Sequence, residues 1–176
     1  MSQVQCIVHG LVEEAREELF KKLIMVGMNQ DGEVEAKQVP PIDWAHLRDQ
    51  PSEIRVGWLF LNDERSRFAV DGQWWLYERM YKELALREKF IDRHGELRRS
   101  GVVAYQRQIE RFQELLLISI HICGRQPART PELLGLRWKN TEYGGVRNIF
   151  IEDGLVAFVT TYHKGYRSSG NIKIIY

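Results

Sequence analysis

Residues 146–161 read VRNIFIEDGLVAFVTT, and this stretch decides the fold of the C-terminal third of the chain. Two β-rich runs, at 146–151 and 155–161, lie on either side of the pair Asp153-Gly154. An Asp-Gly pair between two such runs is typical of the tight turn of a hairpin. A third β-rich run follows at 172–176, so we expect a small antiparallel sheet.

Two segments upstream of the sheet show the periodicity of helices. Apolar residues spaced by three and four predict one helix that ends near Gly27 and another that runs from the N-cap Ser100 to Gly124. The apolar positions are Val12, Ala15, Leu19, Leu23 and Val26 in the first helix, and Val102, Tyr105, Ile109, Phe112 and Leu116 in the second. The last turns of the second helix are apolar nearly all round, so we expect this helix at the centre of its domain.

Residues 72–84 carry large side chains at helical spacing, with Met80 beside them. The positions are Trp74, Tyr77, Tyr81 and Leu84. We interpret this stripe as the core face of a further helix; stacking of nucleobases on its aromatic rings is the alternative. A loop rich in turn-forming residues is expected at about 29–53, within a helical N-terminal region formed by residues 1–99.

The composition is that of an ordinary globular protein. The chain has 176 residues, of which 44% are hydrophobic and 28% are charged. No stretch approaches the roughly 20 apolar residues of a membrane helix, so no membrane partner is expected. The N-terminus lacks the pattern of a secretory signal, and Cys6 and Cys123 are far apart, which suits a reducing, intracellular compartment.

The net charge of +1 conceals an asymmetry. Residues 1–100 contain 15 Lys and Arg against 18 Asp and Glu, a balance of −3, whereas residues 101–176 contain 10 against 6, a balance of +4. A mildly basic C-terminal part permits a polyanionic partner.

Several kinds of chemistry have no motif in this sequence. The five His residues are scattered in no metal-ligand spacing, so no metal is expected. The sequence contains neither a Gly-x-x-x-x-Gly-Lys-Ser/Thr loop nor a Gly-x-Gly-x-x-Gly motif, and we expect no cofactor.

Residues 129–138 read RTPELLGLRW and lie between the second helix and the hairpin. Thr130 and Pro131 predict the start of a helix, with Pro at its first position. Lys164 lies in the motif YHKG, after the second β-rich run and 35 positions beyond Arg129.

These features resemble the tyrosine recombinase, or phage integrase, family. Its first active-site box, Arg-x-x-Glu-Leu-x-x-Leu-x-Trp, follows an apolar helix and precedes a small antiparallel sheet, and its catalytic Lys lies between the second and third strands. Stretches 124–134, 147–154 and 162–166 look like Crypton-type recombinase-like regions of fungal proteins, some of which carry a RecQ-type helicase. The resemblance implies an α+β, mainly helical chain, with a core-binding-like region at 1–99 and the first half of a recombinase-like catalytic domain at 100–176.

The resemblance also implies roles for individual residues. The Arg129 guanidinium would donate to two non-bridging phosphate oxygens, Glu132 would orient it, and Lys164 would protonate the leaving 5′ oxygen as general acid, with no metal required. Five further basic residues are expected to bind nucleic acid: Arg125, Arg137, Lys139, Arg167 and Lys173.

The function expected from the resemblance is DNA binding in the nucleus by a truncated or degenerate relative of the recombinases that integrate fungal mobile elements. The family acts as tetramers, so self-association on DNA is also expected. The His-x-x-Arg box and the tyrosine nucleophile of the family do not follow Lys164, so we expect a fragment that does not cut and rejoin DNA by itself. The alternative is a non-enzymatic module that holds DNA, or another protein, within a larger helicase-bearing protein.

The box also has an ordinary structural explanation. Arg129 and Glu132 have the spacing of a surface ion pair on a helix, and Lys164 with the following Gly has the composition of a simple turn. The apolar side chains of the box would be core residues in any fold: Leu133, Leu134, Leu136 and Trp138.

Overall fold

The computed structural model describes residues 3–27, 39–68, 72–123, 134–160 and 173–175. Over these residues the chain is mainly helical with a small antiparallel sheet, as predicted. The chain divides into two compact units: the first is formed by Met1–Pro41 and Phe68–Ile120, and the second by Ile42–Arg67 and His121–Tyr176. The boundary predicted at residues 99 and 100 is a different division of the chain, and it stays a prediction.

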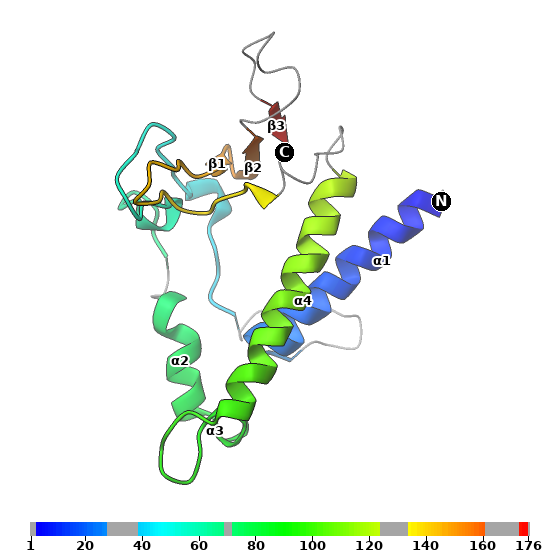
Figure 1. The fold of residues 1–176 in the computed structure, drawn as a ribbon, viewed down its shortest axis with the longest axis vertical. Coiled ribbons are helices and arrows are strands. Elements are labelled where there is room, and N and C mark those ends of the chain that lie inside the picture. The colour runs from blue at the N-terminus through cyan, green and yellow to red at the C-terminus, as the bar shows by residue number, and fades with distance from the viewer. Residues whose placement is uncertain (1–2, 28–38, 69–71, 124–133, 161–172, 176) are drawn as a thin grey trace. The chain divides into compact units, whose positions relative to one another are not determined.

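The first unit contains two long helices, α1 (Gln3–Glu17) and α4 (Arg99–Cys123), which approach each other near the end of α1 (Figure 1). The helix α1 continues into a π-helical segment, η1 (Glu18–Ile24), which ends where Met25 takes a φ of 56°. An ion pair of 2.6 Å joins Glu14 to Arg111 of α4. The Tyr105 hydroxyl of α4 donates a hydrogen bond of 3.2 Å to the carbonyl oxygen of Leu23.

Two shorter helices, α2 (Gly72–Lys82) and α3 (Leu84–Phe90), complete the first unit. Arg79 of α2 donates to the carbonyl oxygens of Ile24 at 2.7 Å and Met25 at 2.9 Å, which satisfies polar groups that the end of η1 leaves open. The described apolar core of this unit consists of Leu23, Val26, Leu86, Phe90, Ile91 and Leu115.

The aromatic stripe of α2 lies on the surface, so the prediction that it faces the core is wrong. Its members Trp74, Tyr77 and Tyr81 are exposed, and so is Leu84, the last residue of the predicted stripe, which the structure places at the start of α3. The more buried side of α2 carries Trp75 and Arg79, one or two positions further along the helix. Arg79 turns this side inward, because its guanidinium stacks on the Trp75 ring at 4.7 Å and reaches the end of η1.

The last turns of α4 are also more exposed than predicted. Leu115 is buried, but Leu116, Ile118 and Ile122 remain exposed. A helix that is apolar all round needs neighbours on every side to be buried, and among the described residues this stretch is buried on one side only. None of the described helices has both the length and the apolar character needed to cross a bilayer.

The second unit contains the predicted sheet. The strand β1 (Ile149–Glu152) pairs with β2 (Leu155–Thr160), which pairs with β3 (Lys173–Ile175); both pairings are antiparallel. In the turn between β1 and β2, Asp153 has a φ of 50° and Gly154 a φ of 75°. These positive values are those of the type I′ turn that Asp-Gly favours, and they confirm the predicted hairpin.

Candidate nucleic-acid interface

A buried ion pair lies at the centre of the second unit. Both nitrogens at the tip of the Arg147 guanidinium donate to the Asp49 carboxylate, at 2.6 and 2.7 Å. Both side chains are 0% exposed. The guanidinium also donates to the Gln50 carbonyl oxygen at 2.9 Å and packs on the Phe150 ring at 4.5 Å. Segment 42–67 is thereby fixed to the residues around β1.

The same ion pair covers the backbone of β1, which is an edge strand of the sheet. The Ile151 amide donates to the Asp49 carboxylate at 3.1 Å, and Arg147 donates to the Ile149 carbonyl oxygen at 3.1 Å. Backbone groups that a further strand would otherwise bind are therefore satisfied by side chains.

Asn140 joins the two segments of the second unit through four hydrogen bonds, and a fifth binds it to Arg147 in its own segment. Its amide group donates to the carbonyl oxygens of Glu53 at 2.9 Å and Arg55 at 3.0 Å. Its backbone pairs with the Gly57 amide at 2.9 Å and the Trp58 carbonyl at 3.0 Å, and its side-chain oxygen accepts from the Arg147 amide at 3.0 Å. The residue is 3% exposed, so all of these bonds lie away from water.

Asn148 connects Arg137, the first residue of a surface loop at 137–146, to the sheet. Its backbone amide donates to the Arg137 carbonyl oxygen at 2.8 Å, and its side-chain oxygen accepts from the Arg137 amide at 3.2 Å. On its other side it forms two hydrogen bonds with the backbone of Val159 in β2, at 2.8 and 2.9 Å. The main chain of Arg137 is thus held at a fixed place beside the hairpin.

The loop that these asparagines anchor, residues 137–146, is called here the aromatic loop. Trp138 is 58% exposed and Tyr143 is 97% exposed. The Lys139 ammonium lies 4.8 Å from the centre of the Trp138 ring. The tip of the loop is closed by bonds from Thr141 N to Gly145 O at 2.8 Å and from Gly145 N to Thr141 Oγ1 at 3.0 Å. Large aromatic side chains therefore project from a fixed backbone.

This exposure corrects two of the core predictions for the box. Trp138 lies on the surface, and Leu134 is 73% exposed. The physical reason for Trp138 is that its neighbours Arg137 and Asn140 are fixed by hydrogen bonds to their backbones, which leaves the side chains between them outside the unit.

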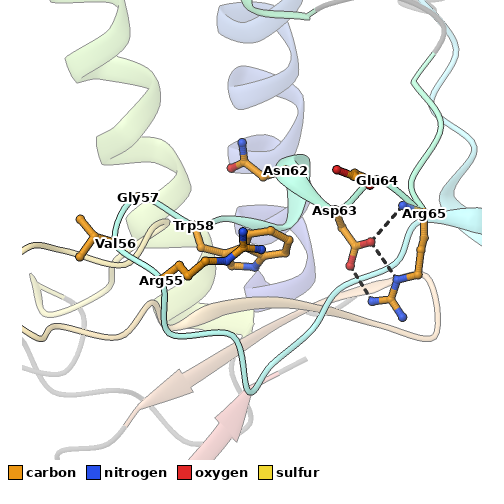
Figure 2. Close-up of a pocket in the computed structure, with 8 residues that line it drawn as sticks. All are labelled: Arg55, Val56, Gly57, Trp58, Asn62, Asp63, Glu64 and Arg65. Carbon is orange, nitrogen blue, oxygen red and sulfur yellow. Dashed lines mark hydrogen bonds and ion pairs between the residues drawn. The ribbon is translucent and has the colours of Figure 1, made fainter.

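A pocket of about 540 Å³ lies in segment 42–67 of the same unit (Figure 2). At one end the Arg55 guanidinium stacks on the Trp58 ring at 4.8 Å, and at the other end Arg65 binds Asp63 through hydrogen bonds of 2.6 and 2.8 Å. The buried indole nitrogen of Trp58 has no hydrogen-bond partner among the described residues.

Two carboxyl groups pair with the arginines of this pocket, Asp63 in its lining and Glu53 beside it, and the pKa of each lies below its ordinary value. The side-chain hydrogen bond from Arg65 lowers the pKa of Asp63 below its ordinary value of 3.8. The backbone amide of Arg55 donates to Glu53 at 2.9 Å and lowers the pKa of that carboxyl below 4.5. Each arginine of the pocket thus has an acidic partner, so the pocket is not a site of strong positive charge.

The structure places two of the predicted nucleic-acid-binding residues fully. Arg137 and Lys139 are both exposed on the aromatic loop. The backbone of Lys173 is described as the first residue of β3, opposite Thr160. The other predicted site residues lie outside the described residues: Arg125, Arg129, Glu132, Lys164 and Arg167. No group of three His, Cys, Asp or Glu in the described part of the chain is placed to hold a metal.

The sequence alone did not identify the residues that position this loop. Asn140, Asn148 and the pair of Asp49 with Arg147 contact partners that are mostly far away in the chain, and no spacing rule relates them. The sequence does carry a signal for Tyr143, because the pair Gly144-Gly145 that follows it favours a turn, and Gly144 has a φ of 75° in the structure.

Comparisons of this chain with protein-family models, with curated proteins and with solved structures find no match.

Proposed function

We propose that this chain binds DNA as a relative of the tyrosine recombinases, and that by itself it holds DNA without breaking it. The order of the elements supports this function. The long helix α4 precedes the box at 129–138, and three antiparallel strands follow. Lys164 belongs to the connection between β2 and β3, as the catalytic Lys of the resembled family does.

The residue types of the box suit a phosphodiester partner. A guanidinium at position 129 offers two parallel donors to phosphate oxygens, and an ammonium at position 164 supplies a third donor and a proton. Arg137 and Lys139 add positive charge on the exposed aromatic loop. Such contacts position a protein on the nucleic-acid backbone without reading its sequence.

The salt dependence of binding tests this function directly. We expect the affinity for a labelled 30-base-pair duplex, measured by fluorescence anisotropy, to fall steeply between about 50 and 200 mM salt, because each neutralised phosphate adds about −0.9 to the slope of log K against log salt. A slope near zero would support a protein-interaction module instead.

Substitutions separate a recombinase-like site from a diffuse basic surface. We expect Arg129→Ala and Lys164→Ala to weaken duplex binding more than Arg107→Ala, which removes an exposed cation from α4 in the first unit. Equal losses for all three variants would contradict a site at these positions. Analytical ultracentrifugation with and without the duplex tests the expected self-association, and a tagged chain tests the expected nuclear location.

Strand cleavage by residues 1–176 is not expected, because no His-x-x-Arg sequence occurs among them. A nicked suicide substrate incubated with the chain should yield no covalent protein–DNA adduct on a denaturing gel. A tyrosine-linked adduct would overturn this part of the proposal.

A further inference from the structure

The aromatic loop, residues 137–146, presents two large rings to solvent, and the Lys139 ammonium lies over one of them, the Trp138 ring. Tyr143 is 97% exposed and Trp138 is 58% exposed. Burial of aromatic rings of this size normally stabilises a folded protein, and these two exposed rings do not contribute that stabilisation.

The loop holds these rings on a backbone that is already ordered. Arg137 is bound at both its amide and its carbonyl by Asn148, and Asn140 is buried with five hydrogen bonds. Thr141 and Gly145 close the tip. A partner that stacks on the rings therefore does not have to order the main chain, which lowers the entropic cost of binding.

The charge beside the rings is net positive, because the loop carries Arg137 and Lys139 against one acidic residue, Glu142. Arg137 and Lys139 flank Trp138 in the sequence, and within the described part of the chain neither forms an ion pair. The Lys139 ammonium at 4.8 Å from the Trp138 ring sits where it can bind a phosphate next to a base stacked on that ring.

The exposed aromatic stripe of α2 differs in this respect. There the rings contact one another, with 5.8 Å between the centroids of Trp74 and Tyr77. The cations of α2 are already paired, Arg79 with Glu83 and Lys82 with Glu78 at 2.7 Å. On the aromatic loop, by contrast, the exposed rings lie beside basic side chains that form no ion pair with the described residues. This difference distinguishes the loop from α2.

We propose that the aromatic loop binds single-stranded nucleic acid, with unpaired bases stacked on Trp138 and Tyr143 and the adjoining phosphates bound by Arg137 and Lys139. This inference builds on the DNA-binding function proposed above and adds the kind of strand that is bound. In a duplex the base faces are covered by neighbouring bases, so stacking on a protein ring requires unpaired bases.

The test compares the full chain with three variants on a labelled 20-nucleotide oligothymidylate and on a 20-base-pair duplex. We expect Trp138→Ala and Tyr143→Ala each to weaken oligothymidylate binding about tenfold, since one base–aromatic stack is worth roughly a factor of 5 to 150. Duplex affinity should change less than about twofold. The matched control is Trp74→Ala, which removes an equally exposed ring from α2 and should leave both affinities unchanged.

Trp138→Phe gives a second measurement that does not depend on the loss of affinity. Phenylalanine keeps a stacking face, so oligothymidylate affinity should stay within about threefold of the original. The quenching of tryptophan fluorescence by bound oligothymidylate should nevertheless decrease, because the stacked indole is absent. Circular dichroism checks that the exposed substitutions leave the fold intact.

The outcomes separate this inference from the proposed function. If the chain binds the duplex but the alanine variants bind oligothymidylate as well as the original chain does, stacking is wrong and DNA binding stands. If oligothymidylate binding depends on Trp138 and Tyr143 while the duplex is not bound, the inference stands and the recombinase-like function is wrong. If the chain binds neither, both are wrong.

Discussion

Arg147 and Asp49 are 98 positions apart in the sequence, yet two hydrogen bonds of 2.6 and 2.7 Å join their charged groups inside the second unit. Neither side chain is exposed to solvent. Because a buried charge without its counter-charge is strongly unfavourable, the structure of the second unit depends on both residues being present.

Loss of one charge from this pair should destabilise the protein severely. We expect Asp49→Asn to lower the free energy of unfolding by about 3–5 kcal/mol, because it leaves the Arg147 guanidinium buried without a counter-ion. Urea denaturation monitored by tryptophan fluorescence measures the change. The control is Asp43→Asn, whose exposed partner is His46, and which should cost less than about 1 kcal/mol. Similar losses for both variants would contradict a structural role of the buried pair.

Removal of the Asn140 side chain should weaken the hydrogen-bonded connection between the two segments of the second unit. Asn140→Ala leaves the carbonyl groups of Glu53 and Arg55 and the amide of Arg147 without their partners. We expect a loss of about 2–4 kcal/mol in the free energy of unfolding. The control is Gln106→Ala, at an exposed position of α4, which should cost less than about 0.5 kcal/mol in the same denaturation experiment.

The ion pair of Asp63 with Arg65 predicts a specific dependence of stability on pH. The hydrogen bond from Arg65 lowers the pKa of Asp63 in the folded state, so the folded state binds a proton less readily than the unfolded state. The stabilisation is therefore fully present above the unfolded pKa of about 3.8 and is lost as the pH falls through the folded value. We expect Arg65→Gln to be less stable than the original chain at pH 7 and the difference to shrink towards pH 2, as measured by thermal unfolding. A difference that grows on acidification would contradict the assignment.

Two helical glycines should respond in opposite ways to the same substitution. A Cβ at Gly101, in the first turn of α4, would lie within 2.4 Å of the Lys89 carbonyl oxygen, whereas a Cβ at Gly10 of α1 meets nothing within 4 Å. We expect Gly101→Ala to destabilise the protein by about 1–3 kcal/mol through overpacking. Gly10→Ala should stabilise it by about 0.5–1 kcal/mol, since alanine loses less backbone freedom in a helix. The melting temperatures of the two variants test this prediction. An increase in melting temperature for both variants would contradict a close approach at Gly101.

Local signals allowed the sheet to be predicted from the sequence. Asp153 and Gly154 favour positive φ whatever surrounds them, and the structure has them in the predicted turn. The orientation of α2 could not be predicted in this way. Its spacing fits more than one face, and the contact of Arg79 with the end of η1, 54 and 55 positions away, decides which face is buried.

The residues of the candidate interface also differ in how well the sequence predicted their positions. Arg137 and Lys139 were among the five residues predicted to bind nucleic acid, and both are exposed, while the binding itself stays a prediction. Trp138 was expected in the core because tryptophan is apolar, but the hydrogen bonds that Asn140 and Asn148 make with distant segments place it on the surface. Such non-local bonds leave no periodic pattern in a sequence.

The separation of Asp49 from Arg147 also sets an order of events during protein synthesis. At about 5–20 residues per second, Asp49 is translated about 5–20 s before its partner, which follows 98 residues later. The first unit has both of its segments once Ile120 has emerged, whereas segment 42–67 must wait for residues beyond His121. The helices can therefore fold on the nascent chain first. The aromatic loop gains its anchors only after Val159 has left the ribosome, so any affinity of this loop for nucleic acid should be acquired after that point.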